Sequence, residues 1–287
     1  MNPSTSSTMA APAAPAWHLA EEACAAAGLT MEDAHGPAAA KRAARVLSTV
    51  WGGGGAEIID PAMLVAIAHA GNLVTVALTG GVPVGAAAGF CGPPGTPFHS
   101  HIVGLLPSAT GRGLGRAIKL YQRAWCLERG IDTMTWTYDP LIARNGYFNI
   151  RRLGGRAVRY YANFYGEMTD AVNGGQPSDR MLVRWDLTVP PPVAGSWSPE
   201  PDPHLAHVAI EDVADSPSTY LPPPGDAHTV LVAVPREIET LRRSDPDLAR
   251  LWRARTRSAL GQLLDDGWVI TDFTRSCQYV LHHERTS

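Results

Sequence analysis

The chain has 287 residues, of which 45% are hydrophobic, and its formal net charge at pH 7 is −3. This length is enough for one large domain or two small ones with a sizeable core. The small net charge gives no broad basic surface and argues against a nucleic-acid partner. The apolar runs are too short to cross a bilayer. Composition therefore predicts a soluble, cytoplasmic protein whose partners include neither nucleic acid nor membrane.

The N-terminus and the cysteines carry no sign of secretion or metal binding. Residues 1–16 are rich in Ser, Ala and Pro and have neither the basic start nor the apolar core of a signal peptide, so we predict a disordered tail. The cysteines are widely separated and show no paired spacing, which favours free thiols over disulfides or a zinc site. They are Cys24, Cys91, Cys126 and Cys277. We expect no metal.

The predicted elements alternate between strands and helices. Two strands, 74–78 and 84–90, are joined by a glycine turn at 80–81, and a third strand covers 99–106. A helix from 115 to about 129, a strand at 133–138, a short helix at 141–153 and a strand at 157–161 follow. This order predicts a mixed α/β (α+β) domain.

A glycine-rich turn lies between the third strand and the first helix. Gly111, Gly113 and Gly115 allow consecutive backbone N–H groups to face an anion without interference from a Cβ atom. The positive end of the following helix adds to this attraction. The lysine of the nucleotide-triphosphate loop is missing, and the spacing Gly-x-Gly-x-Gly differs from the dinucleotide fingerprint. The turn therefore predicts a pyrophosphate site of another kind.

The run from Leu105-Leu-Pro107 to Thr110-Gly-Arg-Gly-Leu-Gly115 resembles the coenzyme A signature of the GCN5-related N-acetyltransferase (GNAT) superfamily. In that signature a strand ending in hydrophobic-x-Pro leads to Arg/Gln-x-x-Gly-x-Gly/Ala at a helix start, and here Thr110 replaces the Arg or Gln. The resemblance covers about residues 28–187. It implies a mostly antiparallel central sheet flanked by helices. It also implies acetyl-CoA or another acyl-CoA as co-substrate.

The same resemblance implies which residues bind the acyl-CoA. Backbone N–H groups of Leu105 and Leu106, where the family's strand separates from its neighbour, would bind the thioester carbonyl. Asn145 and Asn149 would hydrogen-bond the pantetheine arm. The turn, with charge added by two arginines, would hold the pyrophosphate. Its residues are Gly111, Arg112, Gly113, Leu114, Gly115 and Arg116.

Two histidines provide a candidate base. His99 and His101 are two residues apart on a predicted strand, so they share one face. Histidine acts as base or acid near neutral pH. Arylalkylamine N-acetyltransferases of the same superfamily carry a His-x-His proton relay on the equivalent strand, which implies His101 as the general base with His99 behind it. Alternatively, one histidine is packed in the core and the other lies at the surface.

The acid that protonates the departing thiolate is less clearly marked. Many family members use a tyrosine on the helix that is predicted here at 141–153, and Ile150 occupies its position. Tyr147 or Tyr138 would then donate the proton from an altered position. Capping or packing explains these residues equally well.

The chain changes character after Leu187. Pro190–Pro192 and Pro222–Pro224 mark a proline-rich connector over 188–228. A strand at 229–234, a helix from 245 to about 265, and strands at 268–273 and 278–281 are predicted beyond it. This β-α-β-β order resembles the second half of the acetyltransferase unit without its glycine signature. We therefore predict an acyl-CoA-binding domain at 17–187 and a degenerate half-domain at 229–287 that shapes the substrate cleft.

Two further regions suggest substrate recognition. The aromatic and polar run from Tyr160 to Arg180 forms either a substrate wall or ordinary turns and packing. Arg250, Arg253 and Arg257 form a basic stripe on the late helix. We interpret this stripe as a solvated face, with a carboxylate-bearing substrate as the alternative.

The sequence thus predicts an acyl-CoA-dependent N-acyltransferase in metabolism or natural-product biosynthesis. A small-molecule amine would attack the thioester directly, without a covalent enzyme intermediate. One alternative is a GNAT-fold enzyme of other acyl-thioester chemistry, such as hydrolysis, decarboxylation or transfer from a carrier protein. The other is a non-catalytic coenzyme A-binding module. A homodimer is left open.

Overall fold

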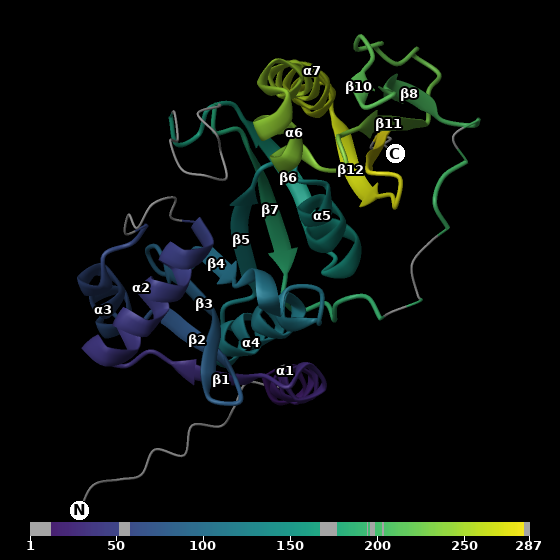
Figure 1. The fold of residues 1–287 in the computed structure, drawn as a ribbon. Coiled ribbons are helices and arrows are strands. Elements are labelled where there is room, and N and C mark those ends of the chain that lie inside the picture. Colours follow the sequence, from purple (N-terminus) through teal and green to yellow (C-terminus); the bar gives the residue numbers. More distant parts are fainter. Residues whose placement is uncertain are drawn as a thin grey trace, which may run out of the picture. The chain divides into compact units, whose positions relative to one another are not determined.

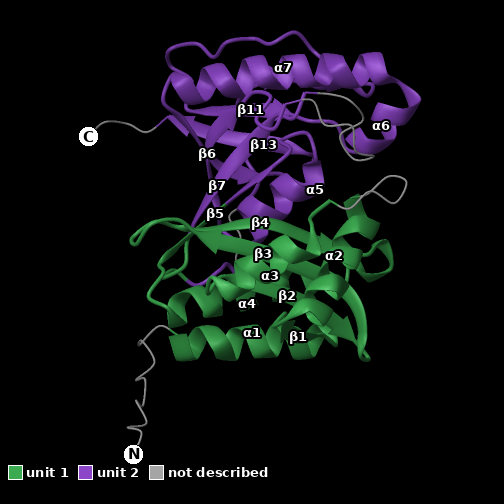
Figure 2. Cartoon of the chain, turned by 90° about the vertical axis from the view of Figure 1, so that its left-hand side faces the viewer, with its two compact units in different colours: residues 1–135, 186–189 green, residues 136–185, 190–287 purple. Residues whose placement is uncertain are grey.

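The structure, a computed structural model, describes residues 13–51, 58–166, 177–193, 195, 199–202 and 204–283. The chain divides into two compact units (Figure 2). The first unit contains residues 1–135 and 186–189, and the second contains 136–185 and 190–287. This division falls inside a strand of the large sheet, at residues 133–138. The domain boundary after residue 187 stays a prediction.

The described residues of the first unit form four α-helices and four complete strands, which are labelled in Figure 1. The helices are α1 (Ala13–Ala27), α2 (Pro37–Trp51), α3 (Pro61–His69) and α4 (Leu114–Glu128). The strands are β1 (Thr30–Asp33), β2 (Leu73–Thr79), β3 (Val82–Cys91) and β4 (Phe98–Leu105), and a short 3-10 helix covers Pro107–Ala109. The three predicted strands and the predicted helix of this region are confirmed to within two residues at each end.

Successive side chains along the strands point to opposite faces of the sheet, so the core of the first unit has two layers. Val74, Val76, Ala86 and Ala88 pack with α2 and α3 on one face of the sheet. Ala77 and Ala87, together with residues of α1 and α4, form the core on the opposite face. This is the period-two burial expected of a sheet covered on both sides. The helices therefore hold the strands, and β4 in particular, between two apolar layers.

The predicted N-terminal tail is wrong for residues 13–16, which begin helix α1. Ala13, Ala16 and Ala20 are buried, and α1 packs against α4. Trp17 reaches Tyr121 of α4, with 5.1 Å between ring centroids. Alanine has the highest helix propensity, and its small side chain allows close packing, so an alanine-rich segment becomes structured once a partner helix is present. Residues 1–12 lie outside the described residues.

The second unit begins within β5 (Thr133–Tyr138). Helix α5 (Ala143–Gly146), a π-helix (Tyr147–Arg152), β6 (Arg156–Tyr161) and β7 (Arg180–Asp186) come next. The C-terminal elements are β8 (His207–Ile210), β9 (Asp212–Val213), β10 (Ser216–Pro217), β11 (Thr229–Ala233), α6 (Ile238–Ser244), α7 (Pro246–Asp265), β12 (Trp268–Phe273) and β13 (Gln278–His283).

The strands form two main sheets. The larger has seven strands in the order β1-β2-β3-β4-β5-β7-β6, and the smaller has four in the order β12-β13-β11-β8. Pairing between β4 and β5 is parallel, while β1–β2, β2–β3, β3–β4 and β6–β7 are antiparallel. The predicted mixed α/β fold with a mostly antiparallel sheet flanked by helices is thus confirmed.

The predicted connector at 188–228 contains structure that the sequence did not reveal. Strand β8 pairs in parallel with β11, so the smaller sheet has four strands instead of the three expected for 229–287. Strands β9 and β10 form a separate antiparallel pair. Strand β8 was not predicted because it has only four residues within a proline-rich region and pairs with β11, about twenty residues later.

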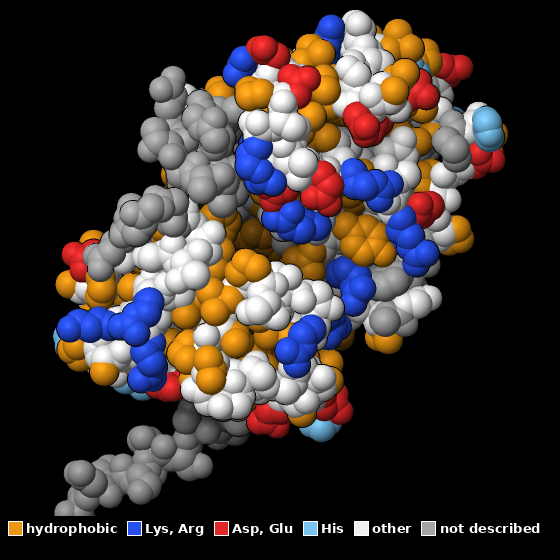
Figure 3. Space-filling view, viewed as in Figure 1, with side chains coloured by type: hydrophobic (Ala, Val, Ile, Leu, Met, Phe, Trp, Pro, Cys, Tyr) orange, Lys and Arg blue, Asp and Glu red, His pale blue; other side chains and the backbone are white. Residues whose placement is uncertain are grey.

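Three further features concern the cysteines, the surface charges and the length of the apolar helices. The four cysteines are free thiols. Lys and Arg side chains are interspersed with Asp and Glu over the face shown in Figure 3. Within the described part of the chain, no helix is long and apolar enough to cross a membrane.

Candidate functional site

The structure places both predicted histidines on one face of β4. The ring centroids of His99 and His101 are 6.1 Å apart. Phe90 of the neighbouring strand β3 lies 5.5 Å from the first ring and 5.8 Å from the second. On the β5 side, His99 Nδ1 is 3.3 Å from Thr135 Oγ1. His99 is half-buried and His101 is exposed, so the second ring is the more accessible of the pair.

The pKa values of both imidazoles are lowered, which favours the neutral form. Burial lowers the pKa of His99, and the nearby His101 and Lys119 lower it further. Partial desolvation also lowers the pKa of His101, although its side chain remains accessible. A neutral imidazole retains a ring nitrogen that accepts a proton, which is what a general base needs at neutral pH.

A buried polar cluster lies on the opposite face of the same strand. Lys119 of α4 donates from Nζ to Ser100 Oγ at 2.9 Å, and this hydroxyl donates to Gln122 Oε1 at 3.0 Å. Burial lowers the pKa of Lys119 to about 7. Sequence reasoning missed this cluster. The available signal was Ser100 itself, because strand alternation directs it away from the histidines and toward the helix.

The glycine turn has the backbone geometry that an anion site requires. Gly111 and Gly113 have φ values of +80° and +82°, in the left-handed region that favours glycine. A Cβ atom at either position would meet no other atom within 4 Å. Gly113 is the N-cap of the 15-residue helix α4, whose first N–H groups have no partner within the helix. Thr110 Oγ1 bonds to Pro107 O at 2.9 Å, which closes the preceding turn.

The expected pair of free backbone donors is wrong for Leu106. Its N–H donates to the carbonyl oxygen of Val84 at 2.9 Å. Because successive N–H groups of a strand point to opposite edges, the N–H of Leu105 faces away from β3. Described pairing between β4 and β5 covers only Phe98–Met134 and His99–Thr135, at the other end of β4. Leu105 is therefore the backbone donor that the strand geometry leaves as a candidate.

The remaining predicted residues lie in the second unit. The helix expected over 141–153 is one turn of α-helix followed by a π-helix that begins at Tyr147. Asn149 is buried and Asn145 is half-buried. The change in helix type interrupts the one-turn spacing that would align these two asparagines. Their role, and that of Tyr147, stays a prediction.

Tyr138 does not suit the role of an accessible acid. It is buried, and its hydroxyl is 3.0 Å from that of Tyr279, which donates to Pro140 O at 2.8 Å. Burial raises the pKa of Tyr138. Its hydroxyl belongs to the core of the second unit.

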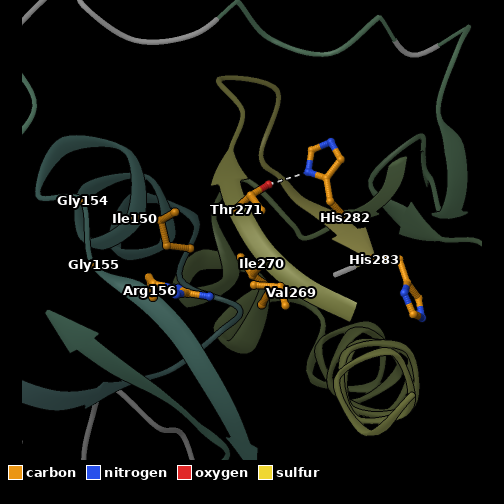
Figure 4. A pocket seen from close by; sticks show the side chains of 9 residues that line it. All are labelled: Ile150, Gly154, Gly155, Arg156, Val269, Ile270, Thr271, His282 and His283. Atoms are coloured by element: carbon orange, nitrogen blue, oxygen red, sulfur yellow. Dashed lines mark hydrogen bonds between the residues drawn. The ribbon is translucent and has the colours of Figure 1, made fainter. Parts of the chain in front are cut away.

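A hollow of about 310 Å³ opens within the second unit (Figure 4). Its walls include Ile150 of the π-helix and Val269 and Ile270 of β12. At one side Thr271 Oγ1 lies 2.7 Å from His282 Nδ1. The lining thus combines these apolar side chains with the polar side chains of Arg156, Thr271, His282 and His283.

Comparisons with known proteins find similarity to solved acetyltransferase structures. Neither a protein-family model nor a curated protein sequence matches the chain. Among solved structures, the ribosomal-protein-S18-alanine N-acetyltransferase from Escherichia coli is 12% identical, with 59% of this chain and 99% of that chain covered and a TM-score of 0.46. An acetyltransferase of the GNAT family from Streptococcus pneumoniae is 11% identical (55% and 98% covered, TM-score 0.45).

The yncA protein from Salmonella typhimurium, solved with its cofactor acetyl-CoA, is 20% identical, with 56% of this chain and 94% of that chain covered and a TM-score of 0.41. All three identities are below 25% and all three TM-scores are below 0.5. No activity is carried from these proteins to this chain on similarity alone.

Proposed function

We propose that this protein is an acyl-CoA-dependent N-acyltransferase that transfers an acyl group, such as acetyl, to a small-molecule amine. The proposal depends chiefly on one observation: the strand that carries His99 and His101 leads within the same unit into a glycine turn at the start of α4. A proton acceptor and an anion cradle thus belong to one strand-turn-helix segment.

The glycine turn fits the pyrophosphate of coenzyme A. The open space beside Gly111 and Gly113 would accept phosphate oxygens, and the first N–H groups of α4 would bind them. The side chain of Arg112 is exposed and would add positive charge. Acyl-CoA, when bound, supplies an activated thioester. The chain's own residues bind it, orient it and move protons.

Proton transfer from the amine is assigned to His101. Its burial-lowered pKa keeps the ring neutral, so it can take the proton that the amine loses as the amide bond forms. His99, held near Thr135 Oγ1, is placed to pass the proton onward. The N–H of Leu105 would donate to the carbonyl oxygen as it gains negative charge. The departing thiolate takes a proton.

Titration calorimetry tests the acyl-donor site. Acetyl-CoA should bind with micromolar affinity, roughly −8 kcal/mol. Gly113→Ala should weaken this binding at least about tenfold, because a methyl group would enter the anion cradle. Gly130→Ala is the matched control, since Gly130 also has a positive φ, +70°, and equally open surroundings at the other end of α4. Equal affinity of the two variants would contradict the proposed cradle.

Turnover tests the chemistry. His101→Gln should keep its affinity for acetyl-CoA and lose about 10²–10⁴-fold in amine-dependent thiol release. Wild-type thiol release that continues without any amine would indicate hydrolysis or decarboxylation instead. Binding with no turnover on any amine would indicate a coenzyme A-binding module.

A further inference from the structure

A buried ionic cluster in the second unit centres on Asp139, directly after β5. Arg242 of α6 and Arg253 of α7 both donate to its Oδ2 atom, at 2.5 and 2.7 Å. The N–H of Leu141 donates to Oδ1 at 3.0 Å. Both oxygens of this carboxylate are therefore already engaged.

A second carboxylate, Asp179, is paired with the next turn of α7. Arg257 donates to it from Nε and Nη2 at 2.9 and 2.6 Å. The hydroxyl of Tyr160 donates to Oδ2 at 2.5 Å, and the N–H of Asn163 donates to Oδ1 at 3.0 Å. Asp179 is fully buried, and its acceptor capacity is also occupied.

This arrangement corrects the interpretation of the arginine stripe as a solvated face. Arg253 is only 3% exposed. Arg257 is half-exposed and paired with Asp179, and Arg250 pairs with Asp247 at the surface. Residues four apart on a helix share one face, so α7 presents Arg253 and Arg257 together to the two buried carboxylates.

Arg253 retains donors that the cluster does not use. Its Nε and Nη1 atoms are buried and have no hydrogen-bond acceptor among the described residues. Buried guanidinium N–H groups without an acceptor are costly, and neither Asp139 nor Asp179 accepts a hydrogen bond from these two donors. An additional acceptor, preferably an anion, would satisfy them.

An exposed aromatic surface is linked to the same cluster through Arg180. The guanidinium carbon of Arg180 lies 5.3 Å from the ring centroid of Tyr165. Phe164 and Tyr165 are 44% and 42% exposed and pack edge to face, with 4.7 Å between centroids. Tyr161 continues this surface, 4.9 Å from Phe164. Clustered exposed aromatic rings beside cationic groups are typical of ligand-binding surfaces.

We propose that the arginines of this cluster and the aromatic surface beside them form a binding site for a small carboxylate with an aromatic or apolar side group. The carboxylate would accept hydrogen bonds from the unused donors of Arg253, because planar guanidinium and carboxylate groups are complementary. The apolar group would pack on Phe164 and Tyr165. The half-exposed side chain of Arg257 provides contact with solvent. This inference concerns the second unit alone and does not depend on the proposed acyl transfer.

Calorimetry and thermal unfolding of the full chain with phenylacetate and its neutral analogue phenylacetamide test the proposal. Phenylacetate should bind at least about tenfold more tightly than the amide and raise the Tm, because only the acid carries the charged acceptor. Equal binding of the two compounds, or no binding of phenylacetate at millimolar concentration, would overturn the proposal. The donors of Arg253 would then be satisfied by buried water.

Variants locate the site. Tyr165→Leu changes an exposed residue and should weaken phenylacetate binding without unfolding the chain. Arg253→Lys keeps a cation beside Asp139 but removes the planar donor set, and it should weaken binding about tenfold or more. Arg250→Met, on the exposed part of the same helix, is the control and should bind normally. Unchanged affinity in both Tyr165→Leu and Arg253→Lys would place the ligand elsewhere and refute the assignment.

Discussion

Lys119 in the first unit and Asp139 in the second are both almost completely buried, yet their pKa values are governed by different effects. For Lys119 burial dominates and lowers the pKa to about 7. For Asp139 burial alone would raise the pKa, but Arg253, Arg242 and the N–H of Leu141 outweigh it and hold the value well below the ordinary range. Burial therefore brings the titration of Lys119 close to neutral pH. Ion pairing instead keeps Asp139 ionised across the neutral range.

Removal of the Asp139 charge should have the largest effect. Asp139→Asn would leave the buried Arg253 and Arg242 without their shared counter-ion, and we expect a loss of about 3–5 kcal/mol in unfolding free energy. Urea denaturation measures this loss. Asp247→Asn, at an exposed ion pair, is the control and should cost less than about 1 kcal/mol. If both variants lose the same unfolding free energy, the buried ion pairs of Asp139 are not a main source of stability in the second unit.

The next largest effect tests the other carboxylate of the second unit. Tyr160→Phe removes the hydroxyl that donates to Asp179 and should cost about 1.5–3 kcal/mol, the range for a hydrogen bond to a charged group. The adjacent Tyr161→Phe, with its ring in the aromatic surface, is the matched control in the same urea experiment. A smaller loss for Tyr160→Phe than for Tyr161→Phe would show that Arg257 and the N–H of Asn163 satisfy Asp179 without the hydroxyl.

The pH dependence of stability tests the first unit. Between about pH 7 and 10.5, the unfolded chain holds a proton on Lys119 that the folded chain has released. Stability should therefore rise with pH in this window, by at most about 1.4 kcal/mol per pH unit from this group. Lys119→Met should remove that part of the slope. Parallel wild-type and variant profiles in urea denaturation would refute the assignment.

The folded-state pKa of Asp139 is also depressed, so its contribution to stability likewise rises with pH, but in acid rather than near neutrality. The stabilisation from this carboxylate is present above the ordinary aspartate range and is lost only as pH falls through the depressed value in strong acid. The second unit's ion pairs should therefore contribute equally across the window in which Lys119 titrates.

The smallest expected effect concerns helix α7, which carries Arg253 and Arg257. Gly261 lies inside this helix, and a Cβ atom there would meet nothing within 4 Å. Gly261→Ala should stabilise the protein by about 0.5–1 kcal/mol, because alanine loses less backbone entropy in a helix. Gly146→Ala is the contrasting variant, since its Cβ would lie 2.6 Å from the Phe273 ring. If Gly261→Ala destabilises instead, α7 is constrained by more than its described contacts.

Elements with strong local signals were predictable from the sequence. Alternating apolar residues and glycine turns defined β2, β3 and β4, and the glycine signature defined the start of α4. Helix α2 was not predicted, because its buried side is largely alanine and differs little in hydrophobicity from its exposed side. Strand β8 was not predicted either, because it is only four residues long and its partner β11 is distant in sequence.

Residues of the candidate sites were likewise predictable only where a local sequence pattern exists. Strand alternation was enough to place His99 and His101 on one face. The partner of Arg253 could not be found from the sequence, because Asp139 lies 114 residues away. The engaged N–H of Leu106 was equally hidden, because a backbone hydrogen bond to a neighbouring strand leaves no trace in side-chain pattern.

The position of Asp139 has a consequence for how such a chain evolves. This aspartate follows the fifth strand of the larger sheet, while both of its guanidinium partners come from helices beyond residue 237. A recombination event in the proline-rich segment would therefore separate a buried anion from its cations. Loss or exchange of the C-terminal portion alone would leave the buried Asp139 carboxylate without these two cations, so we expect Asp139, Arg242 and Arg253 to change together in evolution.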